Sequence, residues 1–318
     1  MTDVEHIAGK TCVVVGAGGF LGAQLCPRLV ALGAKVRAYG RTRYYEAPLK
    51  GVHWFTGTLE DVQKLATLLE GVDVVFHLAA TSSPASAEAS RVSDLNTNVG
   101  GSLGLLDLCR HAGIERIVFA SSGGTVYGDA NNPPFSESTL PKPISAYGIN
   151  KLAAEHYHRL YNHHYGMRNI SLRIANPFGP YQHGLKSQGI VSVFTRQVLE
   201  GSTIRVWGDG SVQRDYLYGA DVAEAMIKAA IYDGGADTFN IGSGVGRSIN
   251  DVIGALEIVL GQKIPVEFQK SRRIDVATSI LDCSLAKREL GWHAGSDWMT
   301  SLEETCNWIR QDIRAANT

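Results

Sequence analysis

The fold is decided by residues 11–22, which read TCVVVGAGGFLG. An apolar run ends at Val15, glycines follow at positions 16, 19 and 22, and a helical pattern begins at Phe20. A strand that leads through a glycine-rich turn into a helix is the setting of a dinucleotide-binding loop. Because residue 21 is leucine, the spacing is GxxGxxG and not GxGxxG.

Glycine permits a tight turn and a close approach of the backbone to a ligand. The N-terminus of the following helix offers free N–H groups and the positive end of its dipole to a pyrophosphate. We therefore predict that the loop binds a dinucleotide through Gly16, Gly19, Phe20, Leu21 and Gly22. The alternative is a tight turn that binds no ligand.

Apolar runs of strand length recur along the first 120 residues, at 11–15, 35–39, 52–55, 72–78 and 116–120. Helical periodicity is found at 20–32, 59–69, 96–111, 146–165 and 221–232. The runs at 74–76 and 117–119 are continuously apolar, which indicates strands buried on both faces. The pattern predicts an α/β fold, a Rossmann doubly wound parallel sheet.

The pattern loosens after Pro177, where glycine, proline and aromatic residues are frequent. We expect a smaller mixed α/β substrate lobe there, with a strand at 203–207 and a helix at 249–260. A later strand at 239–241 is expected to return to the main sheet. The predicted division is 1–176 plus about 216–245 for the dinucleotide domain, and 177–215 plus 246–318 for the interleaved substrate lobe.

The composition argues against several classes of partner. The chain has 318 residues, with 30 Lys plus Arg against 31 Asp plus Glu, so no basic field for nucleic acid or an anionic membrane is expected. The 5 cysteines form no CxxC pair, which predicts neither a zinc site nor a disulfide framework. No signal peptide or membrane span is predicted, and we expect a cytoplasmic protein that acts on a small molecule.

The end of the second strand bears on the choice of dinucleotide. An acid at this position would bind the ribose 2′-hydroxyl of NAD, but the residues present are Gly40 and Arg41. An arginine can pair with the 2′-phosphate of NADP. The alternative is that Arg41 and Arg43 are solvated or stack on adenine.

Tyr147 and Lys151 are the candidate catalytic pair. They are four residues apart, so they lie on one face of a helix. A free tyrosine titrates near 10, and a cation at about 4 Å contributes about 4 kcal/mol at an effective dielectric constant of about 20. We therefore expect Lys151 to assist ionisation of Tyr147. The alternative is that Tyr147 is a surface residue of the helix.

The motifs GAGGFLG, HLAA, SSGGTVYG, YGINK, NPFGPYQ and RDY follow one another along the chain. In this order they resemble the extended short-chain dehydrogenase/reductase superfamily, and within it the UDP-glucose 4-epimerase-like branch of the NAD-dependent epimerase/dehydratase family. The resemblance covers nearly the whole chain. It implies that Tyr147 and Lys151 are catalytic and that the cofactor is also contacted by Leu78, Ala79, Ala80, Asn98 and Ser121.

The chain departs from the family at Gly123, where a serine or threonine usually binds the 4-hydroxyl of the sugar. Thr125 is our first candidate for this role and Ser122 the second. For the nucleotide diphosphate, the resemblance implies binding by Asn176, Arg214, Arg272 and Asp275. Two arginines can clamp a pyrophosphate through their planar guanidinium groups. The alternative for these charged residues is a set of surface ion pairs.

The expected reaction is 4-epimerisation of a UDP-hexose through a transient 4-keto sugar and bound NAD. An NAD(P)-dependent nucleotide-sugar reductase or dehydrogenase is the second hypothesis. A 4,6-dehydratase is disfavoured, because Gly124 and Thr125 replace the acidic pair that elimination requires. A non-catalytic module that senses a dinucleotide is the hypothesis from a different class.

Four histidines lie close together on the helix after Lys151, namely His156, His158, His163 and His164. Their spacing distributes them around the helix, so we expect them at solvent or a subunit interface and predict no metal site. The resemblance implies a homodimer built on this helix. The sequence names neither the sugar nor the base of the nucleotide.

Overall fold

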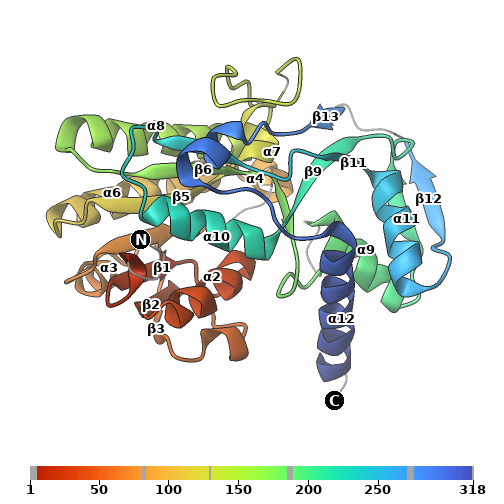
Figure 1. The fold of residues 1–318 in the computed structure, drawn as a ribbon, viewed down its shortest axis with the longest axis horizontal. Coiled ribbons are helices and arrows are strands. Elements are labelled where there is room, and N and C mark those ends of the chain that lie inside the picture. The colour runs from red at the N-terminus through yellow and green to blue at the C-terminus, as the bar shows by residue number, and fades with distance from the viewer. Residues whose placement is uncertain (1–5, 81–83, 129, 185–188, 271–275, 317–318) are drawn as a thin grey trace.

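A seven-stranded parallel sheet forms the centre of the molecule (Figure 1). The computed structural model describes residues 6–80, 84–128, 130–184, 189–270 and 276–316. The strand order is β10-β6-β5-β4-β1-β2-β3, so the direction of winding reverses between β1 and β4. Ligands bind at such a switch point, outside the carboxyl ends of the strands. The predicted Rossmann sheet is thereby confirmed, with strands β1 (Thr11–Val15), β2 (Lys35–Gly40), β3 (His53–Thr56), β4 (Val74–His77), β5 (Arg116–Ser122), β6 (Ile170–Ile174) and β10 (Thr238–Ile241).

Helices cover both faces of this sheet (Figure 1). One face packs on α2 (Phe20–Ala31) and α10 (Gly219–Ala230), in a buried apolar cluster that includes Leu25 and Met226. The other face packs on α3 (Val62–Leu68), α6 (Gly101–His111) and α8 (Ala146–Tyr165), in a second cluster around Leu105. Burial on both faces explains the continuous apolar runs of the sequence.

Helix α8 has clear local signals at both ends. Ser145 is its N-cap, and its side chain accepts a hydrogen bond from the backbone N–H of Gly148 at 3.2 Å. Gly166 ends the helix in the left-handed conformation, with φ of 67°. The helix bounds therefore agree with those predicted.

The smaller lobe lies beside the carboxyl ends of the main strands (Figure 1). One of its sheets contains β7 (Asn176–Phe178), β9 (Gln213–Tyr218), β11 (Gly246–Ser248) and β13 (Thr278–Ser279). The other pairs β8 (Ile204–Trp207) with β12 (Val266–Gln269). The helices α9 (Ile190–Leu199), α11 (Ile249–Leu260) and α12 (Trp298–Ala316) enclose a third apolar core around Phe194 and Leu256.

Asp215 of the RDY motif has a structural role in this lobe. Its Oδ1 accepts from the N–H and the hydroxyl of Ser243, both at 2.7 Å. Its Oδ2 accepts from the N–H groups of Gly244 at 3.1 Å and Leu281 at 3.3 Å. The buried carboxylate thus fixes the loop after β10 against the segment after β13.

Short elements complete the chain: η1 (Ala47–Leu49), α4 (Pro84–Ala89), α5 (Arg91–Asp94), η2 (Leu95–Gly100), α7 (Gly123–Val126) and η3 (Ala286–Leu290). The sequence predicts one helix over 96–111, but residues 95–100 form a π-helical turn, η2, before α6. A π-turn within a helix is frequent at functional sites. Across the described ranges, no helix has both the length and the apolar character needed to cross a bilayer.

Candidate active site

The glycine loop is packed too closely for other residues. Gly16 has φ of 92°, and a Cβ placed there would lie 2.6 Å from the backbone nitrogen of Ala79. A Cβ at Gly22 would lie 2.2 Å from the carbonyl oxygen of Ala17. Gly19 is exposed, and its Cβ would meet only the carbonyl oxygen of Gly16, at 3.4 Å. The loop is therefore closely packed at Gly16 and Gly22, while Gly19 is accessible to a ligand.

The first turn of α2 can receive an anion. Gly19 is the N-cap, no side chain caps the helix, and the first turn contains no acid. The N–H groups of this turn therefore have no partner within the helix. The ring of Phe20 packs toward α10, because a Cβ at Gly219 would lie 2.8 Å from its Cζ. Phe20 thus offers its backbone to a ligand, and the loop fits a pyrophosphate.

The end of β2 leaves little space beside Gly40. A Cβ at Gly40 would lie 3.2 Å from Cη2 of Trp54, so a side chain at this position has little room. Arg41 is exposed, and it forms no hydrogen bond or ion pair with any residue that the structure describes. Arg43, in contrast, pairs with Glu46 at 3.0 Å. The guanidinium of Arg41 is therefore available to a ligand.

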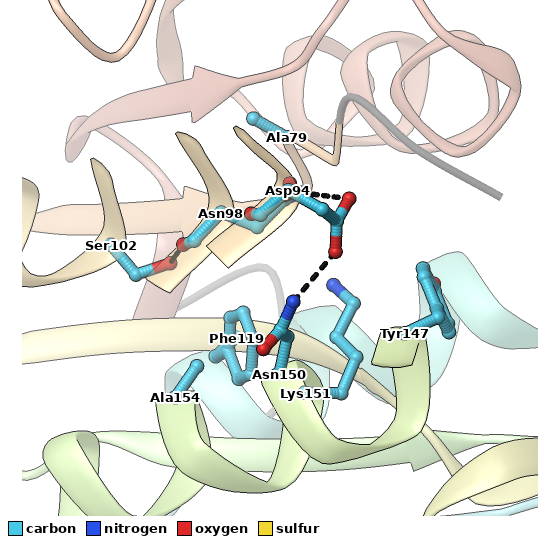
Figure 2. Close-up of a pocket in the computed structure, with 9 residues that line it drawn as sticks. All are labelled: Ala79, Asp94, Asn98, Ser102, Phe119, Tyr147, Asn150, Lys151 and Ala154. Carbon is cyan, nitrogen blue, oxygen red and sulfur yellow. Dashed lines mark hydrogen bonds between the residues drawn. The ribbon is translucent and has the colours of Figure 1, made fainter. Parts of the chain in front are cut away.

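Tyr147 and Lys151 line one pocket, one helical turn apart (Figure 2). The pocket is lined by Ala79, Asp94, Asn98, Ser102, Phe119, Tyr147, Asn150, Lys151 and Ala154. Lys151 is only 8% exposed; its Nζ donates to the carbonyl of Ala120 at 2.7 Å and lies 4.7 Å from the centre of the Phe119 ring. Ala79, from the HLAA motif, faces the pocket, and Leu78 and Ala80 flank it at the end of β4.

The ionisation of this pair differs from the sequence expectation. Burial and the charge of Asp94 raise the pKa of Tyr147 to about 12. Burial lowers the pKa of Lys151 to about 8, against the opposing effects of Glu155 and Asp94. The Nζ of Lys151 lies 5.8 Å from the centre of the Tyr147 ring. Burial and Asp94 therefore set the direction of the shift at Tyr147, because desolvation and a neighbouring negative charge both disfavour the phenolate.

Asp94 is a pocket residue that the sequence argument missed. Its Oδ1 accepts from Nδ2 of Asn98 at 2.8 Å, and its Oδ2 accepts from Nδ2 of Asn150 at 2.6 Å. The side chain is 6% exposed and points toward the space beside Lys151 (Figure 2). Its position four residues before Asn98 on a helical stretch is the signal that could have identified it.

The candidate hydroxyl groups differ in their surroundings. Ser121 is buried and donates to the carboxylate of Glu155. Ser122 is partly exposed at the start of α7, and no hydrogen bond of its side chain is found among the described residues. The Oγ1 of Thr125 is buried, and it also has no hydrogen-bond partner among the described residues. The Thr125 backbone packs against the first turn of α8, because a Cβ at Gly148 would lie 2.7 Å from its carbonyl oxygen.

Gly123 cannot be replaced by the usual serine or threonine without a shift of the backbone. A Cβ at this position would lie 2.8 Å from the carbonyl oxygen of Arg173 and 2.5 Å from Cδ1 of Leu281. The side chain of Leu281 could move, but the carbonyl belongs to strand β6 of the main sheet. A larger residue at position 123 would therefore require a shift in the main sheet.

A buried polar network lies behind the pocket. Nη2 of Arg173 contacts Oε2 of Glu155 at 2.8 Å, and the two side chains are 8% and 5% exposed. Nη1 of Arg173 donates to the hydroxyl of Tyr127 at 3.0 Å, and that hydroxyl donates to Oδ1 of Asn240 at 2.7 Å. The network connects α8 with β6 and β10.

Two of the four predicted substrate-binding residues lie in described parts of the small lobe. The side chain of Asn176 lies beside Gly124, where a Cβ would be 3.4 Å from its Oδ1. Nη1 of Arg214 donates to the carbonyls of Gln213 at 2.8 Å and Val276 at 2.7 Å. Arg272 and Asp275 lie outside the described residues. Asn176 therefore faces the turn that carries Thr125, while Arg214 is anchored to the backbone.

The expectation that all four α8 histidines face solvent or an interface is wrong for His158. It is 1% exposed and stacks on Phe119, with ring centres 4.7 Å apart. Its ring nitrogens and those of the neighbouring His77 have no hydrogen-bond partner in the described structure. Burial lowers the pKa of His158 to about 3, so its ring is neutral. No cluster of three or more His, Cys, Asp or Glu suited to a metal ion occurs among the residues described.

The fold and the pocket define a Rossmann enzyme of the extended short-chain dehydrogenase type, with a tyrosine and a lysine on one helix beside a glycine loop. Residues 12–242 match the profile of the NAD dependent epimerase/dehydratase family, and the chain belongs to this family. The resemblance inferred from the motifs is confirmed.

Relatives and solved structures of this family match along almost their whole length. UDP-glucose 4-epimerase of Mycolicibacterium smegmatis is 32% identical, over 94% of this chain and 98% of the relative. The dTDP-4-dehydro-6-deoxyglucose reductase of Escherichia coli is 30% identical, over 88% and 91%.

Two crystal structures show the same architecture. UDP-glucose 4-epimerase of Thermotoga maritima with UDP-glucose has a TM-score of 0.90 at 33% identity, covering 95% of this chain and 99% of that one. UDP-glucose 4-epimerase of Thermus thermophilus with NAD has a TM-score of 0.87 at 30% identity, covering 94% and 99%.

Proposed function

We propose that the protein is a nucleotide-sugar 4-epimerase of the UDP-hexose class that acts through a transient 4-keto sugar and bound NAD. The observation that carries this proposal is the placement of Tyr147 and Lys151 in one pocket, beside the glycine loop at the switch point of the sheet. The relatives and structures named UDP-glucose 4-epimerase support it. Their family also contains reductases, so the reaction itself needs a test.

Tyr147 is the proposed base for the 4-hydroxyl proton, and it returns this proton when the sugar is reduced again. NAD, held at the loop of Gly16, Gly19 and Gly22, would supply the reversible hydride chemistry at carbon 4 that the chain lacks. Lys151 stabilises the phenolate once the pocket is filled, and its contact with Ala120 fixes the end of its side chain.

Thr125 is the proposed partner of the sugar 4-hydroxyl, with Ser122 as the second candidate. The buried Oγ1 of Thr125 has no partner among the described residues, and an unsatisfied buried hydroxyl requires an explanation. A substrate hydroxyl would supply the missing hydrogen bond. Gly124 provides no acid or base, which supports epimerisation over elimination of water.

The nucleotide diphosphate is proposed to bind between the two lobes. The dinucleotide domain is proposed to comprise 1–176 plus about 216–245, and the substrate lobe 177–215 plus 246–318. Asn176 faces the Thr125 turn and would contact the substrate there. Arg214, Arg272 and Asp275 complete the proposed site for the nucleotide. A firm hold on the nucleotide leaves the sugar free to present either face to the cofactor.

An NADP-dependent nucleotide-sugar reductase is the second candidate function. The specific observation in its favour is the exposed guanidinium of Arg41, which has no partner within the described structure, next to Gly40. A guanidinium in this place suits a 2′-phosphate. The structures of relatives with NAD support the first candidate.

We also propose a homodimer formed through α8 and its neighbours. Exposed apolar side chains occur on α8, at Ile149 and Leu160, and on α5 and η2, which both contact α8, at Val92 and Leu95. Apolar side chains exposed on adjacent elements favour a protein interface.

The decisive experiment incubates the purified protein with a panel of UDP and dTDP sugars and measures C-4 epimers. We expect epimers to form without net consumption of NAD, and Tyr147→Phe to abolish their formation. Strict stoichiometric use of NADPH would overturn the proposal in favour of the reductase. Unchanged cellular function of Tyr147→Phe would favour a non-catalytic dinucleotide sensor.

A further inference from the structure

We propose that Asp94 is a positioning residue whose negative charge holds Tyr147 in the phenol form until a cationic ligand enters the pocket. The inference rests on the proposed function, in which Tyr147 is the proton-transfer group. It assigns a role to a buried carboxylate that no sequence motif identified.

The geometry fixes this carboxylate in place. Each oxygen of Asp94 accepts one side-chain amide, from Asn98 at 2.8 Å and from Asn150 at 2.6 Å. Both amides donate to carboxylate oxygens, so they hold the side chain in this orientation. Asn150 lies between Tyr147 and Lys151 on α8, so it ties the charge of Asp94 to the helix that carries both catalytic groups (Figure 2).

The other titratable groups around the pocket compensate one another. On α8, Glu155 is paired with Arg173 of β6 at 2.8 Å. His158 of α8 and His77 of β4 are buried and neutral, since burial lowers both pKa values. Nearby, Glu88 of α4 is paired with Arg91 of α5 at 2.7 Å, and η2 and α6 contribute only the uncharged Asn98 and Ser102 to the pocket lining.

Two charges of opposite sign therefore remain in the described part of the pocket, Asp94 and Lys151. The Nζ of Lys151 donates to the carbonyl of Ala120 and forms no ion pair with Asp94. At Tyr147 the negative charge of Asp94 disfavours the phenolate and therefore acts in the same direction as burial. Burial and Asp94 together keep the phenol protonated, and the arrival of a positive charge beside Tyr147 opposes both effects.

This arrangement suits a reaction that passes one proton in both directions. A group that was permanently ionised could accept the proton of the 4-hydroxyl but would return it poorly. A group that burial and Asp94 hold in the phenol form, and that a bound positive charge helps to ionise, can do both as the charge beside it changes. Asp94 would thus link the protonation of Tyr147 to the charge of the bound ligand.

The test compares Asp94→Asn, which removes the charge, with Asn150→Ala, which keeps the charge and removes one contact. Tyrosines labelled with ¹³C at the ζ carbon report the phenolate-to-phenol ratio of Tyr147 by NMR in the cofactor-free protein, with Tyr147→Phe for assignment. At a fixed pH between about 10 and 11, we expect a ratio about tenfold higher in Asp94→Asn, because one charge shifts a neighbouring pKa by about one unit or more. We expect a smaller change in Asn150→Ala.

An unchanged ratio in Asp94→Asn, or an equal rise in both variants, would overturn the inference. Asp94→Ser is a second small neutral variant that must raise the ratio if Asp94→Asn does not fold. With an active enzyme, the acid limb of the pH profile of kcat/KM should also move to lower pH in Asp94→Asn. Because the NMR measurement needs no substrate, it tests Asp94 even if the sugar panel shows no epimerisation.

Discussion

Replacing Arg173 by methionine should destabilise the fold by about 3–5 kcal/mol, because it leaves a buried carboxylate without its cation. The side chains of Arg173 and Glu155 are 8% and 5% exposed, and their closest contact is 2.8 Å. The substitution removes further contacts from Nε to both Glu155 oxygens, at 3.2 and 3.1 Å, and the donor to Tyr127 at 3.0 Å. Among the residues that the structure describes, only the hydroxyl of Ser121 remains bonded to Glu155.

The measurement is urea unfolding at pH 7 without NAD, since a bound ligand would add stability of its own. Glu155→Gln and the double variant with Arg173→Met complete a double-mutant cycle. We expect the double variant to be more stable than the sum of the two single effects implies, with a coupling of about 2 kcal/mol, because no unpaired charge remains buried. Additive effects, or a loss below about 1 kcal/mol in Arg173→Met, would show that the carboxylate is solvated or neutral and would refute this reasoning.

Three further predictions follow from the glycine loop, the buried histidines and the end of β2. Gly16→Ala should abolish NAD binding and destabilise the fold by more than about 1 kcal/mol, because φ is 92° and the added Cβ would lie 2.6 Å from the backbone nitrogen of Ala79. Titration calorimetry measures the binding and thermal unfolding measures the stability. Gly19→Ala is the control, and we expect it to reduce stability less. The pKa of His158 is about 3 in the folded protein, against about 6.5 in the unfolded chain. The unfolded chain therefore binds the proton more readily, and the free energy of unfolding falls as the pH drops below about 6.5. At pH 5 this loss of stability is about 2 kcal/mol. His158→Phe should reduce the loss of unfolding free energy between pH 7 and 5 by this amount, and an identical pH dependence would contradict it. If Arg41 binds a 2′-phosphate, Arg41→Ala should lower the affinity for NADP relative to that for NAD by about tenfold, as measured by binding titrations. An unchanged ratio of the two affinities would show that Arg41 does not select the cofactor.

Much of the main sheet could be predicted because its signals are local. Strand β1, the glycines after it and helix α2 follow within 21 residues, and α8 and α11 agree with their predicted bounds because capping residues stand at both ends. The π-turn η2 was not predicted, since its apolar spacing differs little from that of an α-helix. Strands β7, β11 and β13 are only two or three residues long, and their pairing depends on distant segments.

The pocket could be predicted only where a motif marks it. Tyr147, Lys151 and Asn98 line one pocket, as the family pattern implies. The pairing of Asp94 with Asn150 spans 56 residues, and that of Glu155 with Arg173 joins a helix to a strand. The pKa of Tyr147 depends on burial and on Asp94, so a calculation from the charge of Lys151 alone gives the wrong direction for the cofactor-free protein.

Strand β6 connects these separate features through one residue. The carbonyl of Arg173 excludes a side chain at position 123, while its guanidinium neutralises Glu155, which is one helical turn from Lys151. The first contact removes the usual serine or threonine from the pocket and leaves the hydroxyl function to Thr125 or Ser122. The second contact pairs Glu155 with Arg173, so that Glu155 is not a second unpaired carboxylate beside Asp94. The Arg173 pair should therefore determine stability, and the Asp94 and Lys151 charges should determine reactivity, which is why the two sets of variants are expected to affect different measurements.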